Sequence, residues 1–401
     1  YNHHLNIRAF HDGDIEIKNL TNTKIKIRSI IIDDSNYFNK MNFFIEPSKY
    51  SSITKKNFEL GENLNLNSKI KIKYSFNNKL DEKIYETFIE EKISLINDDI
   101  KFYNFKKNGV LINDKDIIFD NREYLITKPI YIPDNYNLII QAGANLKFSK
   151  NSYIFGNNVS LNFLGEKNNK IQLTSLDKSW KGIHIIGNKK KSKINFTKFS
   201  NLDYFSNPKF NLTGGINFYN SYIDIQNSQF SKSYSEDMLN LIHSKFNIIN
   251  CDFSDNSSDA IDSDYSEGQI NGSTFQNVKG DAIDTSGSSV IISDVSINNV
   301  VDKGISVGEK SNVKVINTSI FNTSIGIASK DSSIVTGNNL TIKKSKKYDL
   351  ASYNKKKIFN GGNIEISNVK SDKKFLSQNK SKIIINNKKI AEEKFNSKDL
   401  Y

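Results

Sequence analysis

Two nearly identical five-residue phrases contain the residues best suited to chemistry. Residues 258–262 read Ser-Asp-Ala-Ile-Asp and residues 280–284 read Gly-Asp-Ala-Ile-Asp, so acids recur at the same two places 22 residues later. Paired carboxylates at a fixed spacing suit general acid–base catalysis or the binding of an oxygen-seeking cation such as Ca²⁺. Which chemistry applies depends on the elements that hold the four aspartates.

The 22-residue step continues on both sides of the two phrases. One step back reaches Asp237 and Asn240, and one step forward reaches Lys303 and Ser306. A fixed period in the low twenties, with β-branched runs in each copy, predicts a solenoid that adds one coil per repeat. Seven coils share one strand, whose apolar residue recurs at Ile216, Leu239, Ile261, Ile283, Ile305, Ile327 and Leu350.

A second column of the repeat is rich in asparagine. Its members each stand three residues before an apolar residue and are Asn227, Asn250, Gly272, Asp294, Asn317 and Asn339. Asparagine side chains hydrogen-bond to one another when stacked, and asparagine tolerates the left-handed backbone of a sharp corner. We therefore expect a structural asparagine ladder along one corner of the solenoid.

The rest of the chain predicts an all-β protein of three parts. Residues 1–110 alternate apolar and polar in short bursts and predict a small β-sandwich-like domain. Residues 111–390 predict a parallel β-helix of about 22-residue coils, from which the long loop at 201–213 projects. Residues 391–401 are rich in Lys, Glu and Asn and predict a short cap or tail, with helix as one form of it.

Composition bounds the partners. The net charge is +12, from 56 basic and 44 acidic residues, but the cations are nearly all lysines interspersed with acids, and no arginine-rich arm or aromatic–basic platform predicts nucleic-acid binding. No apolar run is long enough to insert into a membrane.

The single cysteine, Cys251, excludes an intramolecular disulfide. The chain opens without Met or a signal-peptide pattern, which is typical of a mature product or a fragment.

Strand geometry places the acids on one outer face. If Ile261 and Ile283 point into the core, their neighbours Asp262 and Asp284 point outwards, in a polar stripe that also contains His184, Asn217, Asn240 and Ser306. Adjacent coils lie about 4.8 Å apart, so Asp262 and Asp284 should stack within about 5 Å, and Asp264 should lie on a diagonal of about 8 Å from Asp284. His184 is four coils from Asp284, too far to share a proton-transfer step.

Three arrangements would relieve the repulsion between such stacked carboxylates. Ca²⁺ could be held by Asp262, Asp264 and Asp284. Alternatively, one carboxyl is a general acid and its partner a base, the 8 Å diagonal fitting an inverting glycosidase and the 5 Å stack a retaining one. In the third arrangement, Lys303 neutralises Asp281 or Asp259 in a structural salt-bridge ladder. Lys330 would suit a uronate carboxylate or serve as a base.

The coil pattern, the asparagine corner and three phrases at 280–284, 303–308 and 326–331 resemble the right-handed parallel β-helix of the pectin-lyase-like superfamily. The resemblance covers about residues 120–390 and implies that fold. Within it, polygalacturonase-like glycoside hydrolases carry acids on successive coils, which Asp259 and Asp281 match. Gly280 stands in place of the first of the paired acids and Lys303 in place of the histidine, and the arginine is absent. The same phrases resemble β-helix repeats of bacterial cell-surface proteins.

These observations predict an extracellular or cell-surface β-helix protein that engages a polysaccharide, which could be acidic, along its strand face. The candidate catalytic residues are Asp259, Asp262, Asp281, Asp284, Lys303 and Lys330, and the candidate metal ligands are Asp262, Asp264 and Asp284. The sequence leaves open whether the protein cleaves the glycan as a hydrolase or lyase. The alternative is a non-catalytic structural or adhesive module, in which the rod only sets a distance.

Overall fold

The structure is a computed structural model that describes residues 4–10, 13–38, 43–47, 54–59, 64–65, 68–76, 82–90, 103–188, 190–206, 211–396 and 400. The chain divides into two compact units, Tyr1–Ile100 and Lys101–Tyr401. The division precedes the boundary at 110 that the sequence suggests, since Tyr103 and Val110 are buried in the core of the second unit.

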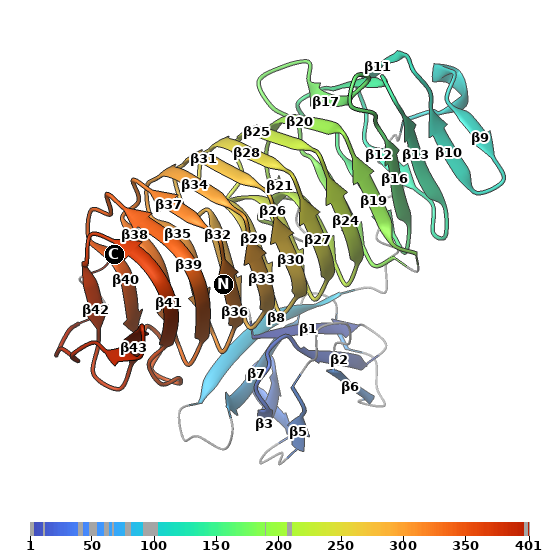
Figure 1. Ribbon diagram of the computed structural model, residues 1–401. Helices are drawn as coiled ribbons and strands as arrows, with labels where there is room; N and C mark the ends of the chain where they lie inside the picture. Colours follow the sequence, from blue (N-terminus) through green and yellow to red (C-terminus); the bar gives the residue numbers. More distant parts are fainter. Residues whose placement is uncertain are drawn as a thin grey trace. The chain divides into compact units, whose positions relative to one another are not determined.

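The first unit is an eight-stranded, mostly antiparallel sheet region (Figure 1). Its strands pair in the order β4-β3-β7-β8-β1-β2-β6, and β5 also pairs with β3. Alternating isoleucines form its core, as in β3, where Ile25, Ile27 and Ile30 are buried. The strands are β1 (Leu5–Phe10), β2 (Asp14–Asn19), β3 (Ile25–Ile32), β4 (Ser35–Phe38), β5 (Phe43–Ile45), β6 (Thr54–Glu59), β7 (Lys69–Phe76) and β8 (Lys83–Glu90).

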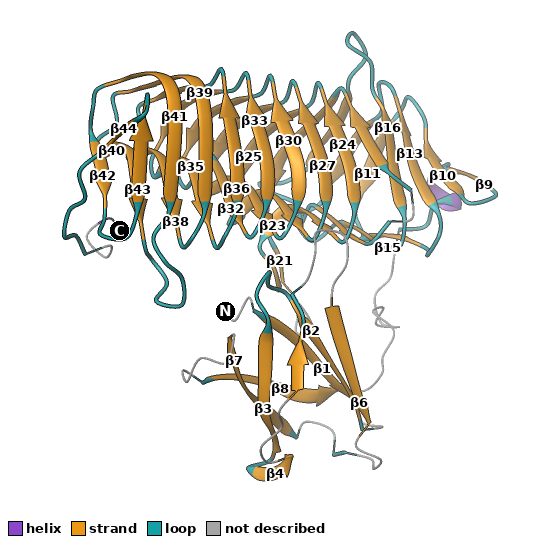
Figure 2. Cartoon of the chain, turned by 60° about the horizontal axis from the view of Figure 1, so that its bottom comes forward, coloured by secondary structure: helices purple, strands orange, loops and turns teal. Residues whose placement is uncertain are grey.

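The second unit is a solenoid of parallel strands, with three strands in each regular coil (Figures 1 and 2). The first strand of each coil joins an 11-stranded sheet, here called the site sheet. Its members are β12 (Ile130–Ile132), β15 (Ile154–Asn157), β18 (Ile183–Ile186), β23 (Gly214–Tyr219), β26 (Asp237–Ile242), β29 (Asp259–Asp264), β32 (Ile283–Ser286), β35 (Lys303–Gly308), β38 (Ile325–Lys330), β40 (Tyr348–Tyr353) and β42 (Phe375–Ser377).

The other two strands of each coil form two further columns of parallel pairs. The second column contains β10 (Asp116–Phe119), β13 (Asn137–Gln141), β16 (Ser160–Leu164), β19 (Ser192–Asn195), β24 (Tyr222–Gln226), β27 (Lys245–Ile249), β30 (Glu267–Asn271), β33 (Ser289–Ser293), β36 (Asn312–Ile316), β39 (Ile334–Lys343), β41 (Asn363–Ser371) and β43 (Lys382–Ile385). The third contains β11 (Glu123–Ile126), β14 (Asn145–Phe148), β17 (Ile171–Ser175), β20 (Thr197–Leu202), β25 (Gln229–Ser233), β28 (Asp252–Asn256), β31 (Thr274–Val278), β34 (Ser296–Val300) and β37 (Ser319–Phe321), and continues into β39 and β41.

The interior of the solenoid repeats with the coil because equivalent residues stack. Phe199, Phe230, Phe253 and Phe275 lie one above another, with ring centroids 4.9, 4.7 and 5.0 Å apart in turn. On the site sheet the predicted column of isoleucines is in register, with Ile261 opposite Ile283 and Ile283 opposite Ile305. The seven coils predicted to share a strand do so.

The predicted asparagine ladder is confirmed. Asn227, Asn250, Asp294, Asn317 and Asn339 have left-handed backbones with φ between 47° and 57°. The Asn339 amide donates to Asn317 Oδ1 over 2.9 Å, and the Asn317 amide donates to Asp294 Oδ1 over 3.2 Å. The ladder thus pairs side chains at a corner of the coil, where the backbone is left-handed and Asn and Asp adopt that conformation readily.

A second ladder, which the sequence analysis missed, stands at another corner. Asn322 donates to Asn299, Asn299 to Asn277 and Asn277 to Asp255, over 3.1, 2.7 and 3.0 Å. These residues also have positive φ. Their 22- or 23-residue spacing was visible in the sequence, but surrounding Ser and Asn residues obscured it.

Short antiparallel strands cover the two ends of the solenoid. At the first coil, β9 (Leu111–Asn113) pairs with β10 after the 3₁₀ turn η1 (Lys106–Asn108). At the last coil, β44 (Lys388–Lys389) pairs with β43. Residues 391–396 of the tail are not helical, Leu400 has a 3₁₀ conformation, and 397–399 and 401 lie outside the described residues. The projecting loop carries the hairpin of β21 (Phe205–Ser206) and β22 (Asn211–Leu212), and residues 207–210 lie outside the described residues. No helix among the described residues has the length and apolarity to span a membrane.

Candidate functional site

Strand register brings the aspartates of successive coils together on the site sheet. Asp237 of β26 lies opposite Asp259 of β29, and Asp262 of β29 lies opposite Asp284 of β32. The register places Asn240 before Asp262 and Ser306 after Asp284, as the 22-residue repeat predicts. The acids therefore form two short rows: Asp237, Asp259 and Asp281 stand at or just before the strand starts, and Asp262 and Asp284 stand within β29 and β32.

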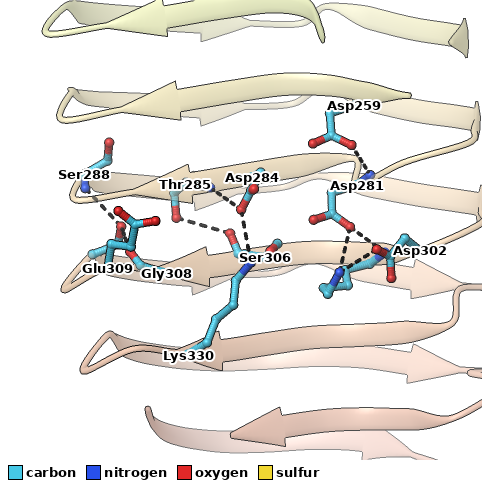
Figure 3. A network of polar contacts seen from close by, with 12 residues as sticks. Asp259, Asp281, Asp284, Thr285, Ser288, Asp302, Ser306, Gly308, Glu309 and Lys330 are labelled. Carbon is cyan, nitrogen blue, oxygen red and sulfur yellow. Dashed lines mark hydrogen bonds and ion pairs between the residues drawn. The ribbon is translucent and has the colours of Figure 1, made fainter. Parts of the chain in front are cut away.

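The first row is tied into the backbone (Figure 3). Asp259 Oδ1 accepts the backbone N–H of Asp281 over 2.7 Å, and Asp281 Oδ1 accepts the backbone N–H of Lys303 over 2.9 Å. Each carboxylate thus bonds to the next coil at the point where a strand of the site sheet begins. These two hydrogen bonds to the backbone fix the positions of the carboxylates. Carboxylates that were only stacked on one another would not be fixed in this way.

Three carboxylates converge at this point. One oxygen each from Asp259, Asp281 and Asp284 lies within 4.8 Å of the others. Asp281 is buried, whereas Asp259 and Asp284 are partly exposed to solvent. We call Asp259, Asp281 and Asp284 the acid cluster.

Two lysines from later coils approach the acid cluster. Lys303 is buried, and its Nζ lies 3.4 Å from Asp281 Oδ1 and 2.6 Å from Asp302 Oδ2. Lys330 Nζ lies 3.9 Å from Asp284 Oδ1 (Figure 3). The structure thus contains the pairing of Lys303 with Asp281 that the third sequence-based arrangement describes.

The local environments separate the pKa values of the acids. Burial, followed by the nearby charges of Asp281 and Asp284, raises the pKa of Asp259 to about 9. Burial also raises the pKa of Asp281, to about 6, because the Lys303 charge offsets only part of the effect. Burial acts on Asp284 in the same direction, but the Lys330 charge, the Ser306 hydrogen bond and the Lys303 charge together outweigh it and lower the pKa of Asp284. These shifts favour a protonated Asp259 and an ionised Asp284 near neutral pH.

The metal ligands proposed from the sequence fall into a different arrangement. Among the described residues Asp262 and Asp264 do not join a group of three close carboxylates, whereas Asp284 groups with Asp259 and Asp281. Asp264 lies opposite Ser286 rather than Asp284, and its pKa is raised by burial and then by the charge of Glu309. Burial, followed by the charge of Asp264, raises the pKa of Asp262. The two-residue step along a strand carries Asp264 away from the acid cluster.

The oxygen atoms of the acid cluster are suitable ligands for a cation, but the cluster already has a positively charged neighbour. Three carboxylates supply the hard oxygen ligands that Ca²⁺ prefers. However, the Lys303 ammonium already lies beside Asp281, and backbone N–H groups bond to one oxygen of Asp259 and one of Asp281. A divalent ion would have to share these oxygens with a buried lysine.

The polar stripe is less exposed than alternation along a strand predicts. His184, Asn217, Asn240 and Ser306 are buried, and only Asp262 and Asp284 keep partial exposure. The reason at His184 is clear. Its ring lies 5.1 Å from that of Phe205 in the projecting loop. One ring nitrogen contacts the Lys181 carbonyl and the other the Asn217 amide.

His184 is therefore structural. Burial lowers its pKa to about 4. Both ring nitrogens have partners, so this residue is not available to a substrate, in agreement with the expectation that it shares no proton-transfer step with the acids.

Two residues near the acid cluster were not singled out from the sequence. Asp302 pairs with Lys303 and so draws that lysine partly away from Asp281. Gly308 lies beneath the Lys330 side chain, because a Cβ on Gly308 would come within 3.2 Å of Lys330 Cε. Gly308 stands in the same column as Asp264 and Ser286. This position could have been noted in the sequence, because a residue without a side chain there lets Lys330 cross the coil.

The comparisons with known proteins agree with this geometry at the level of fold. Residues 214–370 match the family model described as "Right handed beta helix region". This part of the chain is a right-handed β-helix. The match covers β23 to the greater part of β41, and hence every residue of the acid cluster. The search of curated proteins found no match.

Several solved structures resemble the β-helix at low sequence identity. The catalytic domain of a GH87 α-1,3-glucanase in complex with nigerose is 11% identical, with 95% of this chain and 87% of that chain covered and a TM-score of 0.37. The catalytic unit of the GH87 α-1,3-glucanase of Streptomyces thermodiastaticus is 9% identical (92% and 89% covered, TM-score 0.33). The A-module of the mannuronan C-5 epimerase AlgE4 of Azotobacter vinelandii is 12% identical (70% and 99% covered, TM-score 0.34). At these identities the likeness concerns the fold alone.

Proposed function

We propose that the protein acts on a polysaccharide outside the cell or at its surface, and that the acid cluster cleaves a glycosidic bond. One observation carries the proposal: Asp259 and Asp284 lie within 4.8 Å of each other, with pKa values shifted in opposite directions. Two carboxyl groups whose environments separate their pKa values suit the roles of acid and nucleophile or base.

The roles follow from the contacts of each carboxyl. Asp259 Oδ1 accepts the Asp281 N–H, so the other oxygen carries the proton and donates it to the glycosidic oxygen. The ionised Asp284, held by Lys330, attacks the anomeric carbon as the leaving sugar departs. Water, deprotonated by Asp259, then displaces Asp284 and restores both groups. Asp281 and Lys303 are positioning residues for Asp259.

The carboxyl separation favours one stereochemical course. Retaining glycosidases hold their two carboxyls about 5–5.5 Å apart, and inverting enzymes about 6.5–9.5 Å. One oxygen of Asp259 and one oxygen of Asp284 lie within 4.8 Å of each other, which is closer to the separation of a retaining pair than to that of an inverting pair. Proton NMR of the first product anomer would test this assignment directly.

The test of cleavage is an assay of neutral and acidic polysaccharides with wild type, Asp259→Asn and Asp284→Asn. We expect each variant to lose a factor of about 10²–10⁴ in turnover. The matched control is Asp294→Asn, since Asn317 occupies that ladder column in the next coil. New reducing ends would report hydrolysis, and ultraviolet absorbance of unsaturated ends would report a lyase. Equal turnover in wild type and both variants would exclude the acid cluster as the site.

The second candidate function is a non-catalytic surface module. It is favoured by the pairing of Lys303 with Asp281 and Asp302 and by the hydrogen bonds to the backbone, which give part of the acid cluster a structural role. Under this alternative, no polysaccharide of the panel is cleaved. The Asp259→Asn and Asp281→Asn variants would then change stability alone.

A further inference from the structure

Two exposed tyrosines occupy neighbouring turns beside the site sheet. Tyr204 follows β20 and Tyr234 follows β25, and 47% and 44% of their surfaces are exposed. The Tyr234 N–H donates to the Leu202 carbonyl over 2.8 Å, which places the two turns side by side. The two tyrosines are not part of the solenoid core.

Each ring is held by a lysine on an earlier turn. Lys181 Nζ lies 5.0 Å from the Tyr204 ring centroid and 2.8 Å from Asp203 Oδ2. Lys178 Nζ lies 5.3 Å from the Tyr234 ring centroid. Cation–π contacts of this kind orient an aromatic side chain that solvent would otherwise leave mobile. Ordering a ring before a ligand arrives lowers the entropy lost on binding.

The two turns lead towards the acid cluster. Tyr234 stands three residues before Asp237, and Asp237 pairs with Asp259 across adjacent strands. The turn that holds Tyr234 is therefore one coil before the turn that leads into Asp259, a step of about 4.8 Å along the solenoid. Such a step is comparable with the length of one sugar ring, so a glycan parallel to the rod would pass both features.

We propose that Tyr204 and Tyr234 form stacking subsites for neutral hexose units of the glycan, on the side of the acid cluster nearer the first coil. This inference rests on the proposed function. A pyranose has an apolar C–H face and a rim of hydroxyls, so the face packs on an aromatic ring while Lys178, Lys181 and Asp203 offer polar partners to the rim. The ligand is a strand of neutral hexoses, because a tyrosine ring packs on the C–H face of a pyranose, while the Asp203 carboxylate, which pairs with Lys181 beside Tyr204, would repel a uronate.

The chain supplies a matched control. Tyr222 is 41% exposed, and Lys191 Nζ lies 4.7 Å from its ring centroid, but it begins β24 in the second column rather than preceding the site sheet. A Tyr222→Ala variant therefore removes the same kind of ring and the same cation–π contact at a place outside the proposed path. Any effect of losing an exposed tyrosine in general would appear in it.

The experiment is calorimetric titration of neutral and uronate-containing hexasaccharides into the full chain. For the neutral oligosaccharide that wild type binds, Tyr204→Ala and Tyr234→Ala should each weaken binding about tenfold, since an aromatic stack is worth about that factor. Tyr204→Phe and Tyr234→Phe should keep most of the affinity, and Tyr222→Ala should stay within about twofold of wild type. Affinities of Tyr204→Ala and Tyr234→Ala equal to that of Tyr222→Ala would overturn the subsites, as would preference for the uronate oligosaccharides.

Kinetics separate this inference from the proposed function. The tyrosine variants should raise KM and leave kcat near its wild-type value, whereas Asp259→Asn should bind the oligosaccharide and not turn it over. If Asp259→Asn abolishes turnover and the tyrosine variants match wild type, only the subsites are refuted. If wild type neither binds nor cleaves any member of the panel, both proposals are refuted. Circular dichroism and melting temperatures confirm that each variant is folded.

Discussion

Lys330 Nζ lies 3.9 Å from Asp284 Oδ1 although the two residues stand two coils apart. The lysine reaches back across the intervening coil at Gly308, where no side chain blocks it. This ion pair keeps Asp284 ionised in a cluster whose other members have raised pKa values. The charge state of the site is thus decided by a residue from outside the three strands that carry the acids.

Replacing Lys330 by Met should shift the acid limb of the activity profile. Without the ammonium, burial is opposed only by the Ser306 hydrogen bond and by the charges of Lys303 and Lys355, so the pKa of Asp284 rises. Activity that requires ionised Asp284 should then begin to fall at a higher pH than in wild type. The measurement is kcat/KM against pH, with Lys314→Met, on the second column, as the control. An unchanged acid limb would show that Lys330 does not set the ionisation of Asp284.

Removing Lys303 should destabilise the fold strongly. Lys303→Met leaves Asp281 and Asp302 without their buried partner, and breaking a buried ion pair from one side costs about 3–5 kcal/mol. Adding Asp281→Asn should recover part of the loss, because the carboxylate left beside an apolar side chain is then neutral. Urea unfolding of the two single variants and the double variant gives the coupling. Strictly additive effects would contradict the pairing.

Calcium should distinguish wild type from the same lysine variant. In wild type the Lys303 ammonium competes for the oxygens of the acid cluster, so Ca²⁺ should leave the melting temperature nearly unchanged. In Lys303→Met the three carboxylates lack that cation, and Ca²⁺ should raise the melting temperature with its concentration. Scanning calorimetry with Ca²⁺ or with a chelator measures both. A rise in wild type that Asp284→Asn abolishes would instead assign a resident cation site to the acid cluster.

Asp259 should make the protein less stable as pH rises. Its pKa is about 9 in the folded protein and ordinarily 3.8, so across that window unfolding releases a proton. The free energy of unfolding attributable to Asp259 is present below the ordinary pKa and is lost as pH rises through about 9. Between about pH 6 and 9, above the raised pKa of Asp281, wild type should therefore lose more stability than Asp259→Asn.

Denaturant melts at several pH values would show this as a flatter curve for Asp259→Asn. Asp294→Asn serves as the control, since Asp294 lies in the corner ladder and not in the acid cluster. Parallel curves for wild type and Asp259→Asn would mean that Asp259 titrates near its ordinary pKa.

Much of the fold could be predicted because a solenoid repeats its sequence with its structure. The 22-residue period, the stacked isoleucines and the corner asparagines all follow from coils that place equivalent residues one above another. The pairing of Asp262 with Asp284 is part of the same register. The second ladder, from Asp255 to Asn322, obeys the same period and was missed only because its neighbours are equally polar.

The sequence by itself determined the coil, its register and the row of acids, since each depends on residues one period apart. Only the tertiary structure decided which carboxylates meet. Asp259 and Asp281 are fixed by hydrogen bonds to the next coil, Asp264 is carried away along its strand, and Lys330 reaches across two coils. Side-chain reach and backbone hydrogen bonding are not periodic properties, so a repeat shows where the acids stand but not where their oxygens point.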